Sequence, residues 1–448
     1  MALDLTKGNP TKLLLRFMLP MLLSSAFQQF YSVADTFVVG RYIGPGALAA
    51  VGTTGNISSL VLILLQGATS GISVVVAQIF GSGNHGRLRQ SVALSAVLVA
   101  VLALVLGILG AVFTPLLLRL INVPADVLPD ATIYMRIILV GTLASGFYNL
   151  ASSLLRSMGD SVTPLVFLII SSLLNIILNV TFVTAFHMGV PGVAYATVLS
   201  SAISAVAVIL YGWRRMPILR FGRKDMKWDW PLVGTIMKIG LPASLMSATI
   251  NIGMIMIQAL VNGFGSVVMA GYALGLKMEH LFNSLAFSAA NAMQVFTAQN
   301  VGAGDYDRVQ KGFKSSLLIS YCAIAICSPC MIIFGRPILN WFTNDGAAVV
   351  EVAYRYTLMI ALSVPFVIIL ITTRNTMHGA GDAMIPFIMG GLELIARFLC
   401  SYFLSIPWGY VGVFLGTPLA WILGAVYGAL RYRSGKWKTK RIKIESEA

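Results

Sequence analysis

Long apolar stretches alternate with short polar connections along almost the whole chain. Twelve of these stretches reach the roughly 20 residues that an α-helix needs to cross a bilayer core. They lie at residues 14–39, 47–79, 91–113, 132–153, 162–185, 190–212, 233–261, 268–298, 314–335, 350–373, 384–405 and 410–432. A segment in lipid must satisfy its backbone hydrogen bonds internally, and a helix does so. The pattern therefore predicts an all-α integral membrane protein with twelve transmembrane helices.

The chain repeats itself after about half of its length. The segment 77–83 (AQIFGSG), followed by Arg87, returns as the segment 298–304 (AQNVGAG), followed by Arg308, at an offset of 221 residues. Each copy holds six predicted spans, so the two copies share one orientation, with a pseudo-twofold axis along the membrane normal. Matched halves of this kind are typical of transporters that move one half against the other around a central site.

The repeat also predicts the domain organisation. We expect an N-terminal six-helix lobe at residues 1–213, a basic cytoplasmic linker at 214–230, a C-terminal six-helix lobe at 231–432 and a basic cytoplasmic tail at 433–448. The first apolar stretch is too long for a cleavable signal peptide and lacks a small-residue cleavage site, so we expect it to be a retained span.

Composition and charge agree with a membrane protein. Hydrophobic residues make up 57% of the chain and charged residues only 10%, and the formal net charge is +15. The basic residues gather in alternate connections, with Arg374 assigned to one of the inner loops, and this asymmetry predicts that both termini are cytoplasmic. The positive charge thus reflects topology and contact with anionic lipids, and we expect no nucleic-acid partner.

Several motifs resemble nucleotide-binding or redox sites but have a simpler interpretation. Residues 81–86 satisfy the pattern GxGxxG, but no βαβ unit surrounds them, so a tight turn between helices is expected. Cys327 and Cys330 have redox spacing inside a predicted span, where packing is the expected role. The sequence offers no clustered metal ligands and no nucleophile–base constellation, so we expect no cofactor and no enzymatic activity.

Polar residues inside the predicted spans are the main functional candidates, because they are costly in lipid. Asp35 lies in the outer third of the first span, while Asn175 and Asn179 share one face of the fifth and Thr197 lies near the start of the sixth. Hard oxygen ligands around one carboxylate suit a proton or a sodium ion. The alternative is that Asp35 is a neutral residue that only packs against other helices.

The second lobe has no counterpart of Asp35. It instead carries Lys277, Glu279 and Asn283 in the eighth span, and together with Tyr134 we take these as candidate residues of a substrate cavity. Glu279 either faces that cavity and attracts cations, or is neutralised by Lys277 or by a base from another span.

Two further pairs have structural interpretations. Glu393 and Arg397 are four residues apart on the eleventh span, which predicts an ion pair within one helix. Pro20 and Pro242 occupy matching positions in the first span of each half, and we expect them to permit helix bending.

The ordered set of motifs resembles the multidrug and toxic compound extrusion (MATE) transporters of prokaryotes over essentially the full chain. The segments that carry the resemblance are Leu19-Pro20, Asp35-Thr36 with Gly40, the two AQxxGxG segments with their arginines, Leu155-Arg156 with Met158-Gly159-Asp160 and Pro164, and Met188-Gly189-Val190 with Gly192, Ala196 and Thr197. The resemblance implies two six-helix bundles arranged as a V around a central cavity, and cation-coupled export by alternating access from the plasma membrane.

The resemblance also implies roles for single residues. Asp35 matches the family's coupling aspartate, and Asn175 and Thr197 match further positions of its first-lobe cation site. The chain departs from the family pattern at Asn179, where aspartate is frequent, and it lacks the seventh-helix glutamate of NorM-like relatives within residues 247–251. A single carboxylate favours a proton over sodium as the coupling ion, and exchange of one proton for one monovalent cation is electroneutral.

The interpretation that follows is a secondary antiporter, coupled to H⁺ or Na⁺, that exports amphipathic and often cationic drugs. We expect it to contact membrane lipids and to act as a monomer. A flippase for lipid-linked precursors is the alternative among transporters, and an arginine-rich cavity would be its mark. An intramembrane enzyme would need a catalytic constellation that the sequence lacks.

Overall fold

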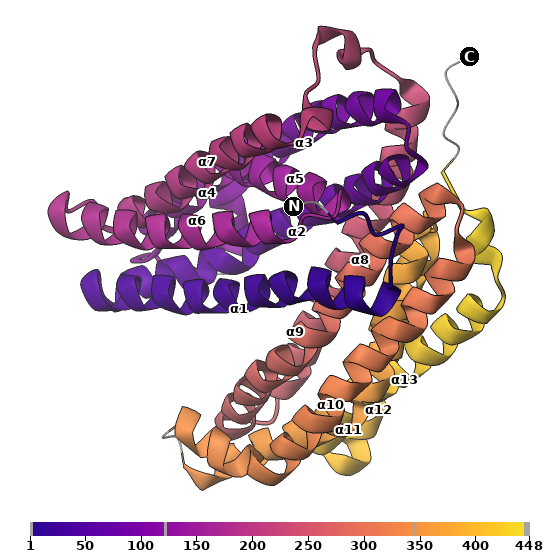
Figure 1. The fold of residues 1–448 in the computed structure, drawn as a ribbon. Coiled ribbons are helices and arrows are strands. Elements are labelled where there is room, and N and C mark those ends of the chain that lie inside the picture. Colours follow the sequence, from indigo (N-terminus) through magenta and orange to yellow (C-terminus); the bar gives the residue numbers. More distant parts are fainter. Residues whose placement is uncertain (1–2, 121–122, 344–345, 443–448) are drawn as a thin grey trace. The chain divides into compact units, whose positions relative to one another are not determined.

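The computed structural model describes residues 3–120, 123–343 and 346–442, and within these ranges the chain is helical and contains no β-strand (Figure 1). The helices are α1 (Pro10–Tyr42), α2 (Pro45–Ser82), α3 (His85–Leu120), α4 (Leu128–Val140), α5 (Thr142–Ser157), α6 (Val162–Val180), α7 (Gly189–Arg215), α8 (Trp230–Asn262), α9 (Ser266–Ala303), α10 (Tyr306–Phe342), α11 (Ala347–Gly379), α12 (Met384–Trp408) and α13 (Tyr410–Arg433). Short turns of other helix types lie at Thr181–Ala185, Pro217–Leu219, Arg223–Met226 and Lys436–Thr439. The all-α prediction is confirmed. Residues 443–448 of the predicted tail lie outside the described residues.

The predicted spans all correspond to helices. Ten of the described helices are long and apolar enough to cross a membrane, and the bent pair α4 and α5 makes an eleventh if it is counted as one span. The remaining predicted span corresponds to α9, which has 38 residues but lacks an apolar stretch as long as those of the other ten. Lys277, Glu279 and several amide side chains in α9 account for this difference. The chain is therefore a multi-pass membrane protein.

The fourth span is broken, which the apolar pattern does not predict. α4 and α5 are bent by 42° relative to each other, and the break falls at Gly141. The matching span of the second half, α11, continues without a break through the corresponding position, Ser363. The two halves share their pattern of spans but differ in the shape of this one.

Contacts between residues divide the described chain into two compact units. Unit 1 holds residues 3–4 and 23–244, and unit 2 holds residues 5–22 and 245–442. The beginning of α1 thus belongs to unit 2 and the beginning of α8 to unit 1. Pro20 lies inside α1 and Pro242 lies inside α8. In each helix the boundary between the two units falls two residues after the proline.

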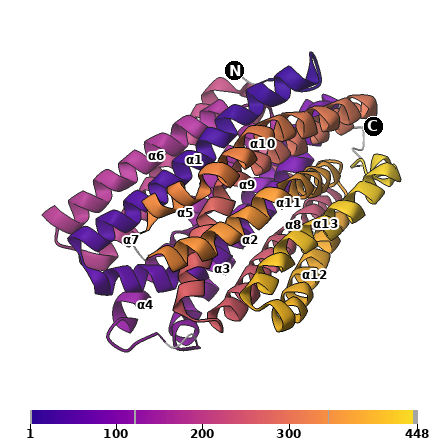
Figure 2. The same cartoon turned by 90° about the horizontal axis from the view of Figure 1, so that it is seen from below.

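Each unit is built around the same span of the repeat. In unit 1, α5 packs against α2, α3 and α7, and α6 packs against α7. In unit 2, α11 packs against α9, α10 and α13, and α12 lies beside α13 (Figure 2). Because α5 belongs to the fourth span and α11 is its counterpart, the packing follows the internal repeat.

The two repeated segments fold in the same way. α2 and α9 end at glycines in the left-handed conformation, with φ of 77° at Gly83 and 81° at Gly304. Glycine adopts this conformation without the steric cost that a Cβ would bring. The next helix begins two residues later in both cases, at His85 and at Tyr306. The GxGxxG segment is therefore a tight turn between helices, as predicted.

The arginine that follows each of these turns binds a residue just before the first helix of a repeat half, which is α8 or α1. The Arg87 guanidinium forms an ion pair with Asp229, the residue just before α8. The Arg308 guanidinium donates hydrogen bonds of 3.2 Å from both Nε and Nη2 to the carbonyl oxygen of Leu5, ahead of α1. The sequence marks both arginines as repeated but does not indicate these partners.

We expect Gly159→Ala to destabilise the protein more than Gly83→Ala. Both glycines have positive φ, 87° and 77°, which costs an alanine about 1–2 kcal/mol. At Gly159 a Cβ would also lie 1.9 Å from the carbonyl oxygen of Leu3, whereas at Gly83 it would meet no atom within 4 Å. Thermal unfolding of both variants in detergent tests this, and an equal loss of stability in the two would contradict it.

Candidate functional site

The predicted polar residues of unit 1 come together between α1, α6 and α7. Asn179 Nδ2 donates a 2.6 Å hydrogen bond to Asp35 Oδ1 and a 2.8 Å hydrogen bond to Asn175 Oδ1. Asn175 Nδ2 in turn lies 3.3 Å from Thr197 Oγ1. The spacing of four residues in α6 places the two amides on one face, and that face meets the carboxylate of α1.

The burial of this cluster is uneven. Asn175 and Asn179 are buried within unit 1, with 1% and 0% of their surface exposed, while Asp35 is only half-buried. The Asn179 Oδ1 atom is buried and accepts no hydrogen bond. One oxygen of the cluster is therefore free to accept a further hydrogen bond or to bind a cation.

Two members of the cluster are missed by sequence reasoning. Asn175 Nδ2 also lies 3.3 Å from Ser200 Oγ, and the side chain of Tyr31 hydrogen-bonds to Thr197 and interacts electrostatically with Asp35. Ser200 is three residues after Thr197 in α7, and Tyr31 is four residues before Asp35 in α1. Their spacing of three or four residues from a predicted site residue on the same helix is the signal in the sequence that could have indicated them.

Tyr134 lies in unit 1, close to Asp35. Its side chain is buried and interacts electrostatically with both Asp35 and Tyr31. Apolar residues of α1 and α7, including Val39 and Val193, pack around it. The sequence groups Tyr134 with Glu279 as cavity residues, and the structure assigns the two residues to different units.

The polar residues of α9 separate onto two faces. Glu279 is buried, accepts a hydrogen bond from the Tyr356 hydroxyl and lies 3.3 Å from Asn283 Nδ2. Lys277 is exposed and forms no ion pair with Glu279 in the described part of the chain. Residues two positions apart point to different sides of a helix, which explains the separation. Tyr356, the repeat counterpart of Tyr134, is the partner that the sequence does not indicate.

Glu393 is the centre of a buried ion-pair network. Arg397 Nη2 lies 2.6 Å from one carboxylate oxygen and Arg374 Nη1 lies 3.3 Å from the other. The predicted pair within α12 is confirmed. The assignment of Arg374 to a cytoplasmic loop is wrong, because the residue is buried inside α11. The apolar run ends at residue 373, but the helix continues to Gly379 with its polar side chains facing the interior of unit 2.

Two cavities within the described parts of the units are lined by residues other than the predicted substrate residues. A cavity of about 220 Å³ in unit 2 is lined by Met278 and Leu281 of α9 and by Cys327 of α10. A larger one, about 400 Å³ in unit 1, is lined by apolar residues of α2, α3 and α8. Cys327 and Cys330 are free thiols. Among the described residues, no group of three or more histidine, cysteine, aspartate or glutamate side chains could hold a metal ion.

Comparison with known proteins shows which family the chain matches. A model of the MatE family matches residues 20–181 and 242–411, so the two matches begin at Pro20 and Pro242. The chain is 28% identical over 445 residues to "Probable multidrug resistance protein YpnP" of Bacillus subtilis, covering 99% of both chains. It is 25% identical over 443 residues to "Probable multidrug resistance protein NorM" of Thermotoga maritima, covering 96% of this chain and 94% of the relative.

Solved structures agree with the fold. A crystal structure of MATE in a bent conformation matches with a TM-score of 0.91 and 21% sequence identity, covering 97% of this chain and 98% of the other. At this identity the likeness concerns the fold alone, and the arrangement of helices is that of MATE transporters.

Proposed function

Because the chain belongs to the MatE family of transporters, we propose that it exports amphipathic, often cationic compounds in exchange for a cation. The names of its relatives support drugs as the substrate class. The predicted lobes, 1–213 and 231–432, alternate access to the substrate, and Pro20 and Pro242 permit the bending of α1 and α8. A transporter of this kind is not an enzyme and needs no cofactor beyond its coupling ion.

The observation that carries the proposal is the hydrogen-bonded chain from Asp35 through Asn179 and Asn175 to Thr197. Its one carboxylate is half-buried and its other members are neutral. A carboxylate that gains and loses a proton in this setting changes the charge of the cluster by one. The buried Asn179 Oδ1, which accepts no hydrogen bond, gives the cluster one unused acceptor.

We propose a proton as the coupling ion. A sodium ion held by one carboxylate depends mainly on neutral oxygen ligands, and it loses the attraction that a second negative charge would add. Exchange of one proton for one monovalent cation moves no net charge. The pH difference therefore drives export, and the membrane potential does not.

A flippase for lipid-linked precursors is less well supported. Such a protein needs an arginine-rich cavity to hold a pyrophosphate. The two buried arginines of unit 2, Arg374 and Arg397, share the carboxylate of Glu393 instead. This pairing neutralises part of the positive charge that a pyrophosphate would need.

We further propose a location for the transporter. The bacterial relatives and the membrane-spanning helices support a multi-pass protein of the bacterial plasma membrane. The gathering of basic residues in alternate connections supports cytoplasmic termini, with the linker 214–230 on the same side. The protein is proposed to act as a monomer.

Flux of a cationic dye into proteoliposomes tests the proposed function. Purified protein receives the dye under an imposed pH gradient and, separately, under an imposed sodium gradient. We expect movement on the pH gradient only. Movement on neither gradient would overturn the proposal, and movement on the sodium gradient alone would replace the proton by sodium.

We expect Asn179→Asp to give the transporter a response to sodium. The change adds a second carboxylate beside Asp35 Oδ1, and the added charge attracts a sodium ion. Dye flux on a sodium gradient measures the effect, with Asn149→Asp in α5 as the matched control. Sodium-independent flux in both variants would contradict the assignment of this cluster as the ion site.

A further inference from the structure

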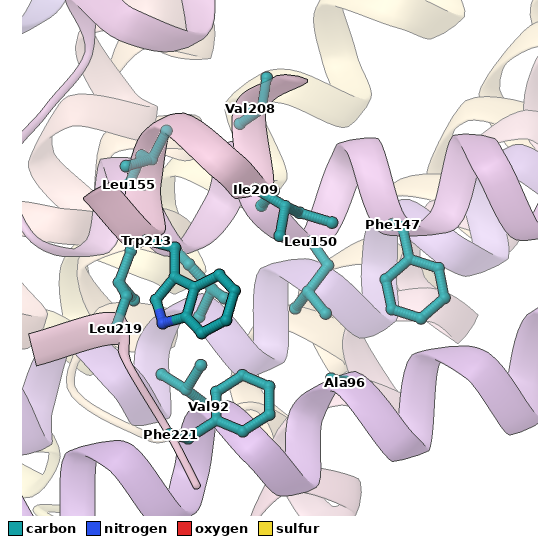
Figure 3. A pocket seen from close by; sticks show the side chains of 13 residues that line it. Val92, Ala96, Phe147, Leu150, Leu155, Val208, Ile209, Trp213, Leu219 and Phe221 are labelled. Carbon is teal, nitrogen blue, oxygen red and sulfur yellow. The ribbon is translucent and has the colours of Figure 1, made fainter. Parts of the chain in front are cut away.

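An apolar cavity of about 320 Å³ lies in unit 1 at the beginning of α3 and the ends of α5 and α7 (Figure 3). The residues around it include Val92 of α3, Leu150 of α5, Val208 and Trp213 of α7, and Leu219 and Phe221 of the linker. None of the candidate coupling-ion residues lines it. The cavity is therefore separate from the cluster around Asp35.

The linker forms one wall of this cavity. After α7 the chain turns back, and Arg220 fastens the turn by donating from Nε to the Trp213 carbonyl at 2.8 Å and from Nη2 to the Arg214 carbonyl at 3.2 Å. Leu219 and Phe221, on either side of Arg220, then line the cavity. Trp213 and Phe221 remain 53% and 37% exposed, so the apolar wall is open to its surroundings.

Basic residues lie close in the chain to residues that line the cavity. Arg89 lies one helical turn before Val92 in α3, Arg215 lies three residues beyond Gly212 in α7, and Arg220 belongs to the linker wall. All three are exposed, and none forms an ion pair in the described ranges.

The two acidic residues of the linker, Asp225 and Asp229, are outnumbered by the basic residues. Asp229 pairs with Arg87, and Asp225 accepts a 2.7 Å hydrogen bond from the backbone of Gly222. The linker also presents the exposed Lys224 and Lys227. The cavity is thus apolar in its interior, and the charged residues adjoining its lining are mostly basic.

We infer that this cavity binds an anionic phospholipid. One acyl chain occupies the apolar interior beside Trp213, and the phosphate lies against Arg89, Arg215 and Arg220. A lipid is the occupant that the charges favour, because a cationic drug would be repelled by the same arginines. The membrane supplies such a lipid directly to a site at the ends of transmembrane helices. The inference does not rest on the proposed transport activity.

Quenching of tryptophan fluorescence tests the site on the purified full chain in detergent. The probes are phosphatidylglycerol and phosphatidylcholine, each brominated on an acyl chain. We expect saturable quenching by the first at much lower concentration than by the second, and loss of most of this quenching in Trp213→Phe.

Two kinds of variant separate the role of the basic residues from that of the cavity. Each arginine adds on the order of fivefold to the affinity for an anionic lipid, so the double variant Arg89→Gln, Arg215→Gln, which leaves the linker wall held by Arg220 intact, should bind phosphatidylglycerol about 25-fold more weakly. The matched control removes two exposed basic residues after α13, through Lys436→Gln and Lys440→Gln. It should leave the affinity unchanged.

The second variant is Ala96→Phe, which fills the cavity and should abolish saturable quenching while thermal unfolding confirms that the protein is folded. Equal affinity for the two lipids would overturn the inference. Equal effects of the two double variants, or unchanged quenching in folded Ala96→Phe, would also overturn it.

Discussion

Asp35→Asn reduces dye flux on a pH gradient to the level of vesicles without protein. Asparagine keeps the size and the hydrogen-bonding capacity of the side chain but cannot exchange a proton, so the cluster loses its one change of charge. The hydrogen bond to Asn179 constrains the side chain that is replaced. Flux in proteoliposomes under the pH gradient is the measurement, and this is the largest effect on activity that we expect.

The control for this variant is Asp130→Asn. Asp130 is exposed in the first turn of α4, so the same chemical change occurs away from the cluster. It should keep flux at the wild-type level. Retained flux in Asp35→Asn would leave export in place but would remove Asp35 from the coupling site.

Glu393→Leu has the largest expected effect on stability. The change leaves Arg374 and Arg397 without their shared carboxylate, and the three side chains are only about 7% exposed. Breaking a buried ion pair by removing one partner costs roughly 3–5 kcal/mol, because a charge, here that of the Arg374 guanidinium, stays buried without compensation. Chemical or thermal unfolding in detergent measures the loss.

The matched control lies near the beginning of α11, where Glu351 faces α10. Glu351 also bridges two arginines, Arg336 and Arg355, but its side chain is 40% exposed and those of its partners 58% and 50%. Water solvates these arginines when the carboxylate is removed, so Glu351→Leu should leave the midpoint of unfolding nearly unchanged. Similar losses in the two variants would show that burial does not decide the energy of the Glu393 network.

Much of the fold can be predicted from the apolar pattern because a bilayer requires helices of a minimum length. The repeat then indicates which elements correspond, and the turns at Gly83 and Gly304 follow from glycine's conformational freedom. The pattern marks apolar runs rather than helix ends. For this reason it places Arg374 in a loop, although the helix continues past it into a buried polar environment.

The cluster around Asp35 can be predicted only in part. Helical spacing shows that Asn175 and Asn179 share a face, and the family resemblance adds Thr197. Which side chains of other helices meet that face depends on packing. The sequence therefore does not predict that Tyr31 and Ser200 belong to the cluster. The same limit applies in unit 2. Spacing within α9 does not show that Glu279 meets Tyr356, or that Lys277 points away.

Counting protons per transported cation tests the central claim most directly. Proteoliposomes loaded with a pH-sensitive fluorophore receive a monovalent cationic dye from outside, with the membrane potential clamped. The account predicts that wild-type vesicles release one proton from the lumen for each dye molecule taken up, at a rate that does not depend on the clamped potential, and that Asp35→Asn vesicles release none. Dye uptake without a change in luminal pH, or the same proton release in Asp35→Asn, would contradict it.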